Sequence, residues 1–371
     1  MHSGLQIKLL PAGSYRLMSA RSVAAELTVV SFSETQSGHS QDILTLVEML
    51  NRLGVTSERF VLAADFHNVQ SLPERPVVLV MNASMAVKAS HAIKAYRGSI
   101  IIISYSAWEL PNPPVGLVEA PIDIVLAGSR FAEKSLGIAR PDTIYLPLLV
   151  ESRPLRFGRN VAIGGPFTFL SVLNLCSYSS RKNPWGVINA FSAAFAPQDF
   201  GVRLVLKVSG SNCDPHEYQK LLAAADQDRR IVIDSRRLSR KAMHQIFGRC
   251  DAYVSLHRSE GFGRTIAEAM QNKKPVIATA WSGSMDLTAR EVSFLCDFVL
   301  RPLADKEYVE FTGQTWAEPD TAHAARLMAH VAGLSLGHRQ KVGSAAAATI
   351  RKKFGYTVNA EAYENVFCSL R

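Results

Sequence analysis

An alternation of short apolar runs with stretches of helical periodicity constrains the fold of this chain more than any other feature. In the first half, four runs have the length and composition of strands: 26–32, 76–81, 99–104 and 122–127. Between the first two, apolar residues recur at helical spacing from Ile43 to Leu53. Runs that are apolar throughout are typical of parallel strands buried on both faces. Their alternation with helices predicts a doubly wound α/β domain.

The alternation lapses from about 149 to 166, where Gly, Pro and Arg are frequent, and then begins again. Five further runs predict a second parallel sheet: 167–173, 203–208, 230–234, 251–256 and 274–279. Because 371 residues exceed one compact core, two domains are expected. We predict an N-terminal domain over 1–150, a linker over 151–166, a second domain over 167–345, and a C-terminal helix over 346–371 that packs back on the first domain. Two such domains facing each other leave a ligand-binding cleft at the carboxyl ends of their strands.

Composition excludes several classes of protein. The chain is 47% hydrophobic and 20% charged, which is typical of a folded protein rather than a disordered one. Its net charge of +9 favours anionic partners such as phosphates or lipid head groups. Nucleic acid is not expected as a partner, because no basic run with interleaved aromatic residues occurs.

Targeting and redox signals are sparse. No apolar run reaches the length of a membrane span, and Pro11 and Arg16 interrupt the N-terminus where a signal peptide needs an apolar core. The five cysteines are scattered, without a C-x-x-C spacing. This pattern predicts reduced thiols, a cytoplasmic location and no zinc site.

Two glutamates flank a glycine loop in the second half. Glu260 follows the predicted strand 251–256, and Glu268 falls about one turn into the next helix. The intervening Gly261 and Gly263 leave backbone N–H groups bare at the helix start, which suits a phosphate. The two carboxylates lie on separate elements, so they suit two polyols on either side of a phosphate, the layout of a nucleotide-sugar. By spacing alone, two solvated glutamates are the commoner alternative.

The residues around these glutamates resemble a known family. E-G-F-G-R-T-I-A-E-A-M, followed by K-P-V-I-A-T and W-S-G, is similar to the E-x7-E region of retaining glycosyltransferases of the GT-B fold, family 4. The segments 177–195, 249–259 and W-A-E-P-D at 316–320 resemble further parts of that family's donor domain, the last as in bacterial polysaccharide-assembly members. The resemblance covers 167–320, with thinner matches at 104–111 and 125–132. It implies two Rossmann-like domains facing a cleft, an acceptor-binding N-terminal one and a nucleotide-sugar-binding C-terminal one.

The resemblance also implies catalytic roles. Glu260 would bind hydroxyls of the donor sugar and orient its anomeric carbon. Arg181 and Lys182 would clamp the diphosphate and stabilise the charge that develops as it leaves, in place of a divalent metal. No metal site and no cofactor are therefore expected, since the nucleotide-sugar is itself a substrate. The motif Asp226-x-Asp228 is expected to be a solvated turn, because metal ligands need a convergent cavity.

Donor binding is implied for the rest of the loop. Glu268 would accept both ribose hydroxyls, and backbone groups of Gly261, Phe262 and Gly263 would complete the phosphate cradle. Glu109 is a candidate contact for donor sugar or acceptor, with a purely structural role as the alternative.

The function implied is transfer of a hexose-type unit, with retained configuration, from a nucleotide-diphosphate sugar to a glycan or lipid-linked glycan in polysaccharide or lipopolysaccharide biosynthesis. The basic surplus suggests a peripheral contact at the inner face of the membrane. Two alternatives stay open: a non-catalytic glycan- or nucleotide-binding GT-B module, and a nucleotide-sugar epimerase.

The chain departs from the family pattern in three places. Ser177 stands where many members carry an arginine five residues before the lysine. The first loop of the N-terminal domain, 33–42, has only Gly38 instead of a glycine-rich run. Trp108 and Glu109 stand where many members have a histidine near the sugar. These departures leave open whether the N-terminal loop supports catalysis.

Overall fold

The computed structural model describes residues 26–32, 38–150 and 165–368. The N-terminal segment with Pro11 and Arg16, residues 33–37 of the glycine-poor loop, and most of the linker lie outside these residues.

The first lobe is built on a six-stranded parallel sheet with the order β2-β1-β3-β4-β5-β6. Its strands are β1 (Glu26–Ser31), β2 (Thr56–Val61), β3 (Val77–Leu79), β4 (Ile102–Ser106), β5 (Ile124–Ala127) and β6 (Ile144–Tyr145). Its helices are α1 (Gly38–Arg52), α2 (Ala83–Tyr96) and α3 (Arg130–Leu136), with a short turn η1 (Val69–Ser71). Every residue of β3, β4 and β5 is buried, as expected for strands covered by helices on both faces.

The second lobe repeats this plan with the strand order β12-β11-β10-β7-β8-β9. Its strands are β7 (Phe167–Asn174), β8 (Val202–Ser209), β9 (Ile231–Asp234), β10 (Ala252–Ser255), β11 (Val276–Thr279) and β12 (Phe294–Cys296). An antiparallel ribbon, β13 (Phe298–Pro302) and β14 (Thr315–Pro319), is added to it. The helices are α4 (Ser179–Lys182), α5 (Pro184–Ala194), α6 (Pro215–Gln227), α7 (Arg240–Arg249) and α8 (Arg264–Gln271), with turns η2 (Leu175–Ser177) and η3 (Ser282–Asp286).

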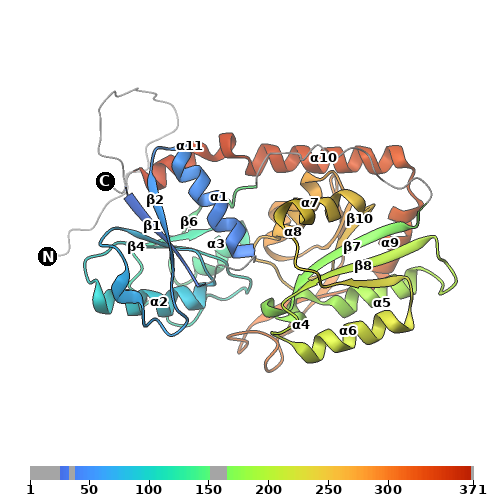
Figure 1. The fold of residues 1–371 in the computed structure, drawn as a ribbon, viewed down its shortest axis with the longest axis horizontal. Coiled ribbons are helices and arrows are strands. Elements are labelled where there is room, and N and C mark those ends of the chain that lie inside the picture. The colour runs from blue at the N-terminus through green and yellow to red at the C-terminus, as the bar shows by residue number, and fades with distance from the viewer. Residues whose placement is uncertain (1–25, 33–37, 151–164, 369–371) are drawn as a thin grey trace.

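The C-terminal helices tie the lobes together (Figure 1). α9 (Thr321–Gly333) packs on α5, and α10 (Leu336–Phe354) lies along α8. α11 (Tyr356–Phe367) then reaches the first lobe, where it contacts α1. Its Tyr363 hydroxyl donates to Pro147 O at 2.9 Å. The prediction of two Rossmann-like, doubly wound α/β units is confirmed.

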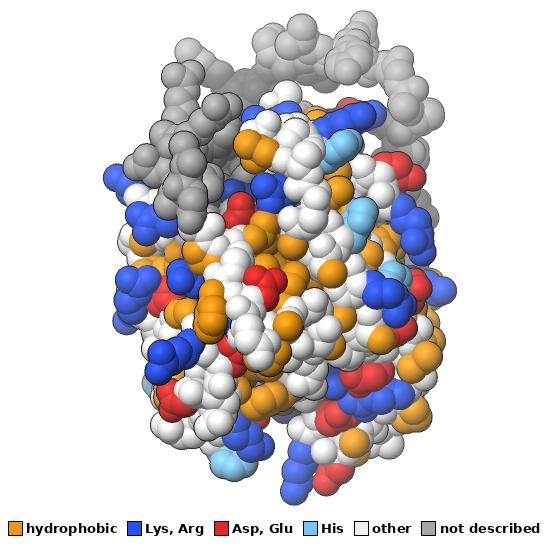
Figure 2. Space-filling model, turned by 90° about the vertical axis from the view of Figure 1, so that its right-hand side faces the viewer, with side chains coloured by type: hydrophobic (Ala, Val, Ile, Leu, Met, Phe, Trp, Pro, Cys, Tyr) orange, Lys and Arg blue, Asp and Glu red, His pale blue; other side chains and the backbone are white. Residues whose placement is uncertain are grey.

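Charge is mixed over the end of the second lobe that Figure 2 shows, where Lys and Arg side chains are interspersed with Asp and Glu. Among the described residues, no helix is long and apolar enough to cross a bilayer.

Candidate functional site

The loop after β7 presents two cations on one helical turn. Tyr178 (φ 60°) and Asn183 (φ 51°) both have left-handed backbone and so bracket α4 sharply on either side. Asn183 caps the next helix, since its Oδ1 accepts from Gly186 N at 3.1 Å, and its Nδ2 donates to Leu256 O at 2.9 Å. These bonds tie the turn to the end of β10, so Arg181 and Lys182 face the glutamate loop.

The glutamate loop is fixed by close backbone contacts. Glu260 N donates to Ser282 Oγ at 2.8 Å, and Gly283 N donates to Glu260 O at 2.8 Å. A Cβ on Gly283 would lie 2.0 Å from Gly261 O, so only glycine permits this approach. Gly263, with φ 91°, then turns the chain into α8. The backbone around Glu260 is therefore held rigidly before any ligand binds.

Four charges from three segments meet at this loop. Lys182 Nζ lies 2.5 Å from Glu260 Oε1, and Arg181 Nη1 lies 3.3 Å from Glu260 Oε2. Arg181 Nη1 also donates to Ser259 O at 2.8 Å, and its Nη2 lies 3.9 Å from Glu109 Oε1. Glu109 comes from the first lobe, after β4. Arg181, Glu260 and Glu109 are 4%, 7% and 8% exposed, so this is a buried cluster with two positive and two negative groups.

The charge state of Glu260 follows from its neighbours. Burial acts to raise the pKa of its carboxyl, but Lys182 and Arg181 outweigh that effect and hold the pKa at about 2. Burial lowers the pKa of the adjacent His257 to about 4, so its imidazole is neutral at pH 7. Its ring nitrogens lie 3.0 Å from Ser255 Oγ and 3.1 Å from Ser284 Oγ. His257 is thus a packed, hydrogen-bonded residue under the loop.

Glu268 is in the opposite state. It lies on α8, partly buried, and burial raises the pKa of its carboxyl to about 7, with Arg264 and Arg240 opposing the shift. Both glutamates act on the buried Tyr253, whose pKa is raised by burial and further by Glu260 and Glu268. At neutral pH one of the two carboxyls is therefore ionised and the other is close to its midpoint.

The lobes are bridged directly beside the site. Arg264, the first residue of α8, pairs with Asp42 of α1 and donates to Leu149 O at 2.6 Å. The Ser259 hydroxyl donates to Glu109 O. Neither bridge is predicted by the sequence, because each depends on which loops the two lobes bring together. For the Arg264 bridge, the only signal in the sequence is that an arginine directly follows the glycine loop.

Asp228, from the Asp226-x-Asp228 motif, and Lys207, near the end of β8, both have structural partners. Asp228 ends α6 and pairs with Arg230 at 2.7 Å. The Lys207 ammonium donates to the carbonyls of Arg236 and Asp234 at 2.7 and 3.1 Å. Within the described ranges, no cluster of three or more His, Cys, Asp or Glu side chains is arranged to hold a metal ion.

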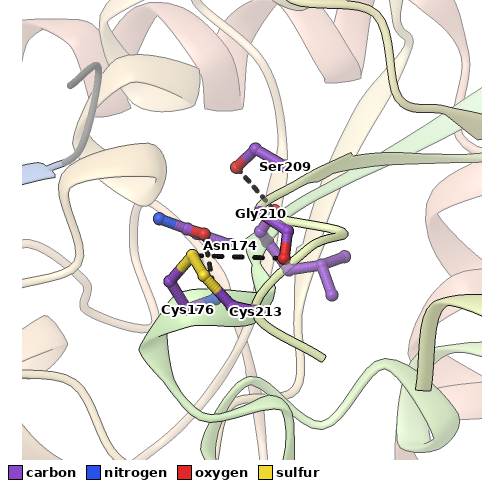
Figure 3. Close-up of a disulfide and its surroundings, with 6 residues drawn as sticks. Asn174, Cys176, Ser209, Gly210 and Cys213 are labelled. Carbon is purple, nitrogen blue, oxygen red and sulfur yellow. Dashed lines mark hydrogen bonds between the residues drawn. A yellow bond between two sulfur atoms is a disulfide. The ribbon is translucent and has the colours of Figure 1, made fainter. Parts of the chain in front are cut away.

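A disulfide joins the loops that follow β7 and β8, which corrects the prediction of reduced cysteines. Cys176, in η2, is bonded to Cys213, in the loop after β8 (Figure 3). The two residues are 37 apart in sequence, but β7 and β8 are adjacent parallel strands, so the loops at their carboxyl ends meet. Ser179 Oγ donates to Asp214 Oδ2 at 3.3 Å across the same junction. The cysteines Cys250, Cys296 and Cys368 are not in disulfides.

Residues 165–310 match the family model of the glycosyl transferases, group 1. The matched range holds the second sheet and every residue of the cluster except Glu109. No curated protein sequence matches the chain.

Solved structures show the same fold over nearly the whole chain. Anabaena Alr3699/HepE in complex with UDP and glucose has a TM-score of 0.66 and 14% identity, covering 93% of this chain and 100% of that one. A glycosyltransferase from Rickettsia africae ESF-5 has a TM-score of 0.67 and 13% identity, covering 94% and 98%. Apo OtsA has a TM-score of 0.66 and 10% identity, covering 94% and 99%. The two-lobed arrangement is therefore the GT-B fold, and the range that matches the group 1 model lies in its second lobe.

Proposed function

We propose that this protein is a retaining, metal-independent glycosyltransferase that moves a sugar from a nucleotide-diphosphate donor to a glycan or lipid-linked glycan. The observation that carries the proposal is the buried cluster of Lys182, Glu260 and Arg181, which lies at the carboxyl ends of the second sheet and faces Glu109 of the first lobe. That edge is where ligands bind in open parallel sheets. The group 1 match and the UDP-glucose complex of Alr3699/HepE support this class of donor.

Arg181 and Lys182 differ in their partners and in their exposure, so we assign them different roles. Arg181 is held by Ser259 O and by two carboxylates, so it organises the cluster. The Lys182 side chain is more exposed, at 17% against 5% for Arg181, and its ammonium pairs with Glu260 alone among the described carboxylates. We assign to Lys182 the neutralisation of the departing diphosphate. Charge that develops on a leaving group is stabilised most by a cation already in place.

The remaining roles follow the loop. Glu260 stays ionised at neutral pH and accepts hydrogen bonds from hydroxyls of the transferred sugar. Glu268 accepts hydrogen bonds from the ribose hydroxyls. The backbone of Gly261, Phe262 and Gly263 holds the diphosphate at the start of α8, where the helix dipole favours an anion. The departing phosphate takes the acceptor's proton, so no separate base is assigned. The configuration of the anomeric carbon is retained.

We further propose that the acceptor belongs to bacterial polysaccharide or lipopolysaccharide assembly and that the protein works in the cytoplasm, in peripheral contact with the membrane. The net charge of +9 supports contact with an anionic surface. Thiol alkylation and mass spectrometry of Cys176 and Cys213 in cells test the compartment, because disulfides are rare in the cytosol. Reduced thiols would support the cytoplasm, and an intact disulfide would contradict it.

One assay separates this function from its alternatives. UDP- and GDP-sugars are incubated with the protein in the presence of EDTA, and free nucleotide and changed sugars are quantified. Release of nucleotide supports a metal-independent transferase. Nucleotide binding without turnover indicates a binding module, and a changed sugar without nucleotide release indicates an epimerase.

Calorimetry with the free nucleotide tests the assignment of the glutamates. Glu268→Ala should weaken nucleotide binding even when no sugar is attached, because its partner is the ribose. Glu260→Ala should leave that affinity nearly intact and abolish turnover, because its partner is the transferred sugar. The reverse pattern would overturn the assignment.

A further inference from the structure

A segment of the second lobe packs against the first lobe. The ribbon pairs Phe298 with Pro319 at its base and Pro302 with Thr315 at its far end. Residues 303–314, here called the arm, connect the two strands beyond that point. Leu303 N donates to Gln314 O at 3.1 Å and closes the arm on itself.

The arm belongs to the hydrophobic core of the other lobe. Leu303 and Tyr308 are 8% and 5% exposed and share one core cluster with the fully buried Trp108 and Leu110 of the first lobe. An arm that only covered the surface would leave these side chains exposed. Its apolar residues are therefore anchored in the first lobe, although the ribbon that carries them belongs to the second.

Polar contacts fix the register of the arm on the first lobe. Asn112 N donates to Gln314 Oε1 at 3.1 Å, and Val115 N donates to Glu310 Oε2 at 2.8 Å. These bonds use backbone donors of the loop that directly follows Glu109. The arm and the Glu109 loop are therefore held against each other.

Tyr308 lies at the point where the arm, the first lobe and the Arg181 loop meet. Its hydroxyl donates to Glu109 Oε2 at 2.5 Å, and Asn82 Nδ2 donates to the same hydroxyl at 3.3 Å. Its ring packs against Tyr178, with 4.6 Å between centroids. On the opposite carboxylate oxygen of Glu109, Arg181 Nη2 lies at 3.9 Å.

We propose that Tyr308 is a positioning residue, which acts through Glu109 on the transferred sugar. This inference rests on the proposed function. A carboxylate offers about four acceptor positions, so one bond from Tyr308 and the Arg181 contact leave positions for sugar hydroxyls. Because one oxygen accepts from Tyr308 and the other faces Arg181, the remaining positions point in a fixed direction. A sugar is recognised by Glu109 and Glu260 together, and Tyr308 fixes the orientation of Glu109.

The test compares two tyrosines that each bond a glutamate. Tyr308→Phe keeps the ring and removes the bond to Glu109. The control is Tyr356→Phe, which removes the bond from α11 to Glu48 (3.0 Å) at a residue that is also 5% exposed but lies outside the cluster. We expect kcat/KM for the donor to fall about ten- to a hundredfold in Tyr308→Phe, as for a lost hydrogen bond to a charged group. It should change less than threefold in the control, and the affinity for free UDP or GDP should stay within twofold of wild type in both.

A double-mutant cycle separates positioning from folding. If Tyr308 acts through Glu109, Tyr308→Phe combined with Glu109→Gln should be no slower than Glu109→Gln alone. Thermal unfolding is measured for every variant, so that a loss of folded protein is not counted as a loss of rate. An active wild type whose Tyr308→Phe variant has unchanged kcat/KM, or whose two substitutions multiply independently, would overturn this inference alone. A wild type that releases no nucleotide from any donor would overturn the proposed function.

Discussion

The two lobes share one sheet plan but differ at the carboxyl ends of their strands. In the second lobe, left-handed residues shape these loops, including Tyr178, Asn183, Gly263 and Ser282. In the described part of the first lobe, the residues that reach the site, Glu109 and Asp42, lie on ordinary backbone and are held by partners from the other lobe. The site loops of the second lobe are thus shaped by their own backbone. The site residues of the first lobe are instead held in place by side chains of the second lobe.

This difference explains where a family pattern can be recognised. A loop shaped by its own residues, such as the turn with Asn183 and the one with Gly263, needs particular residue types in a particular order. A side chain held from the opposite lobe needs only a suitable partner, which different sequences supply in different ways. The matched range, 165–310, accordingly stops short of the first lobe.

The largest expected effect tests whether the second lobe holds the chemistry. Lys182→Ala should lower kcat about 10²- to 10³-fold, as for removal of one preorganised group that stabilises a leaving charge. The control Lys220→Ala removes a half-exposed lysine of α6 and should leave kcat within twofold. Nucleotide release is the measurement. If Lys182→Ala retained wild-type turnover, the assignment of the leaving-group cation would be wrong.

A second prediction tests how tightly the glutamate loop is packed. Gly283→Ala places a methyl group against the carbonyl of Gly261, so we expect it to destabilise the protein by about 3 kcal/mol and to impair turnover. Gly333→Ala is the matched control, because a Cβ there meets nothing within 4 Å and Gly333 ends α9. Its effect on chemical denaturation should be small. Equal effects of the two substitutions would contradict the close packing of the glutamate loop.

The disulfide provides a third and smaller test. Cys213→Ser opens a closed loop of 37 residues, and we expect a loss of about 2–3 kcal/mol in unfolding free energy. The loss should fall at the low end of the usual range because hydrogen bonds, such as Ser179 to Asp214, hold the same loops. Adding a reductant should lower the stability of wild type but not that of Cys213→Ser. If the reductant lowered the stability of both proteins equally, the disulfide between Cys176 and Cys213 would not be the cause of the loss.

The sequence predicts the fold well where strands are buried on both faces. The predicted apolar runs include those that become β3, β4 and β5 and five of the six strands of the second sheet, but not β12. β2 was not predicted, because it is an edge strand with the polar sequence T-S-E-R-F-V and an exposed face. The ribbon β13–β14 was also missed, since most of β13 is half-buried or exposed.

The site is predictable only in part. The family resemblance places Glu260, Arg181 and Lys182 in one site, and the structure brings these three together. Tyr308 has no such signal, because its role depends on Glu109, 199 residues earlier in the chain. The same holds for Cys176 and Cys213, whose pairing follows from the adjacency of two strands rather than from spacing. The sequence alone does not predict contacts between the lobes or between loops on neighbouring strands.

The smallest expected effect concerns pH and compares the two glutamates of the second lobe. The pKa of Glu268 is about 7 in the folded protein, above its ordinary value of 4.5, so the folded state binds this proton more tightly than the unfolded chain. Its contribution to stability is therefore full below pH 4.5 and is lost as the pH rises through 7. Glu260 behaves oppositely, since its pKa of about 2 gives a contribution that is present above pH 4.5 and lost as the pH falls toward 2.

Glu268→Gln isolates the first of these effects. Because the amide cannot ionise, the variant should be more stable than wild type at pH 8 by about 1–2 kcal/mol, less than the full shift implies since Glu268 is partly exposed. At pH 4 the two proteins should be equally stable. Thermal unfolding from pH 4 to 8 measures the difference, with Glu119→Gln, an exposed carboxylate of the first lobe, as the control whose effect should stay small throughout. A stability difference that did not grow between pH 4.5 and 7 would mean that Glu268 is ionised in the folded protein, and that the second lobe does not hold its two acids in opposite states.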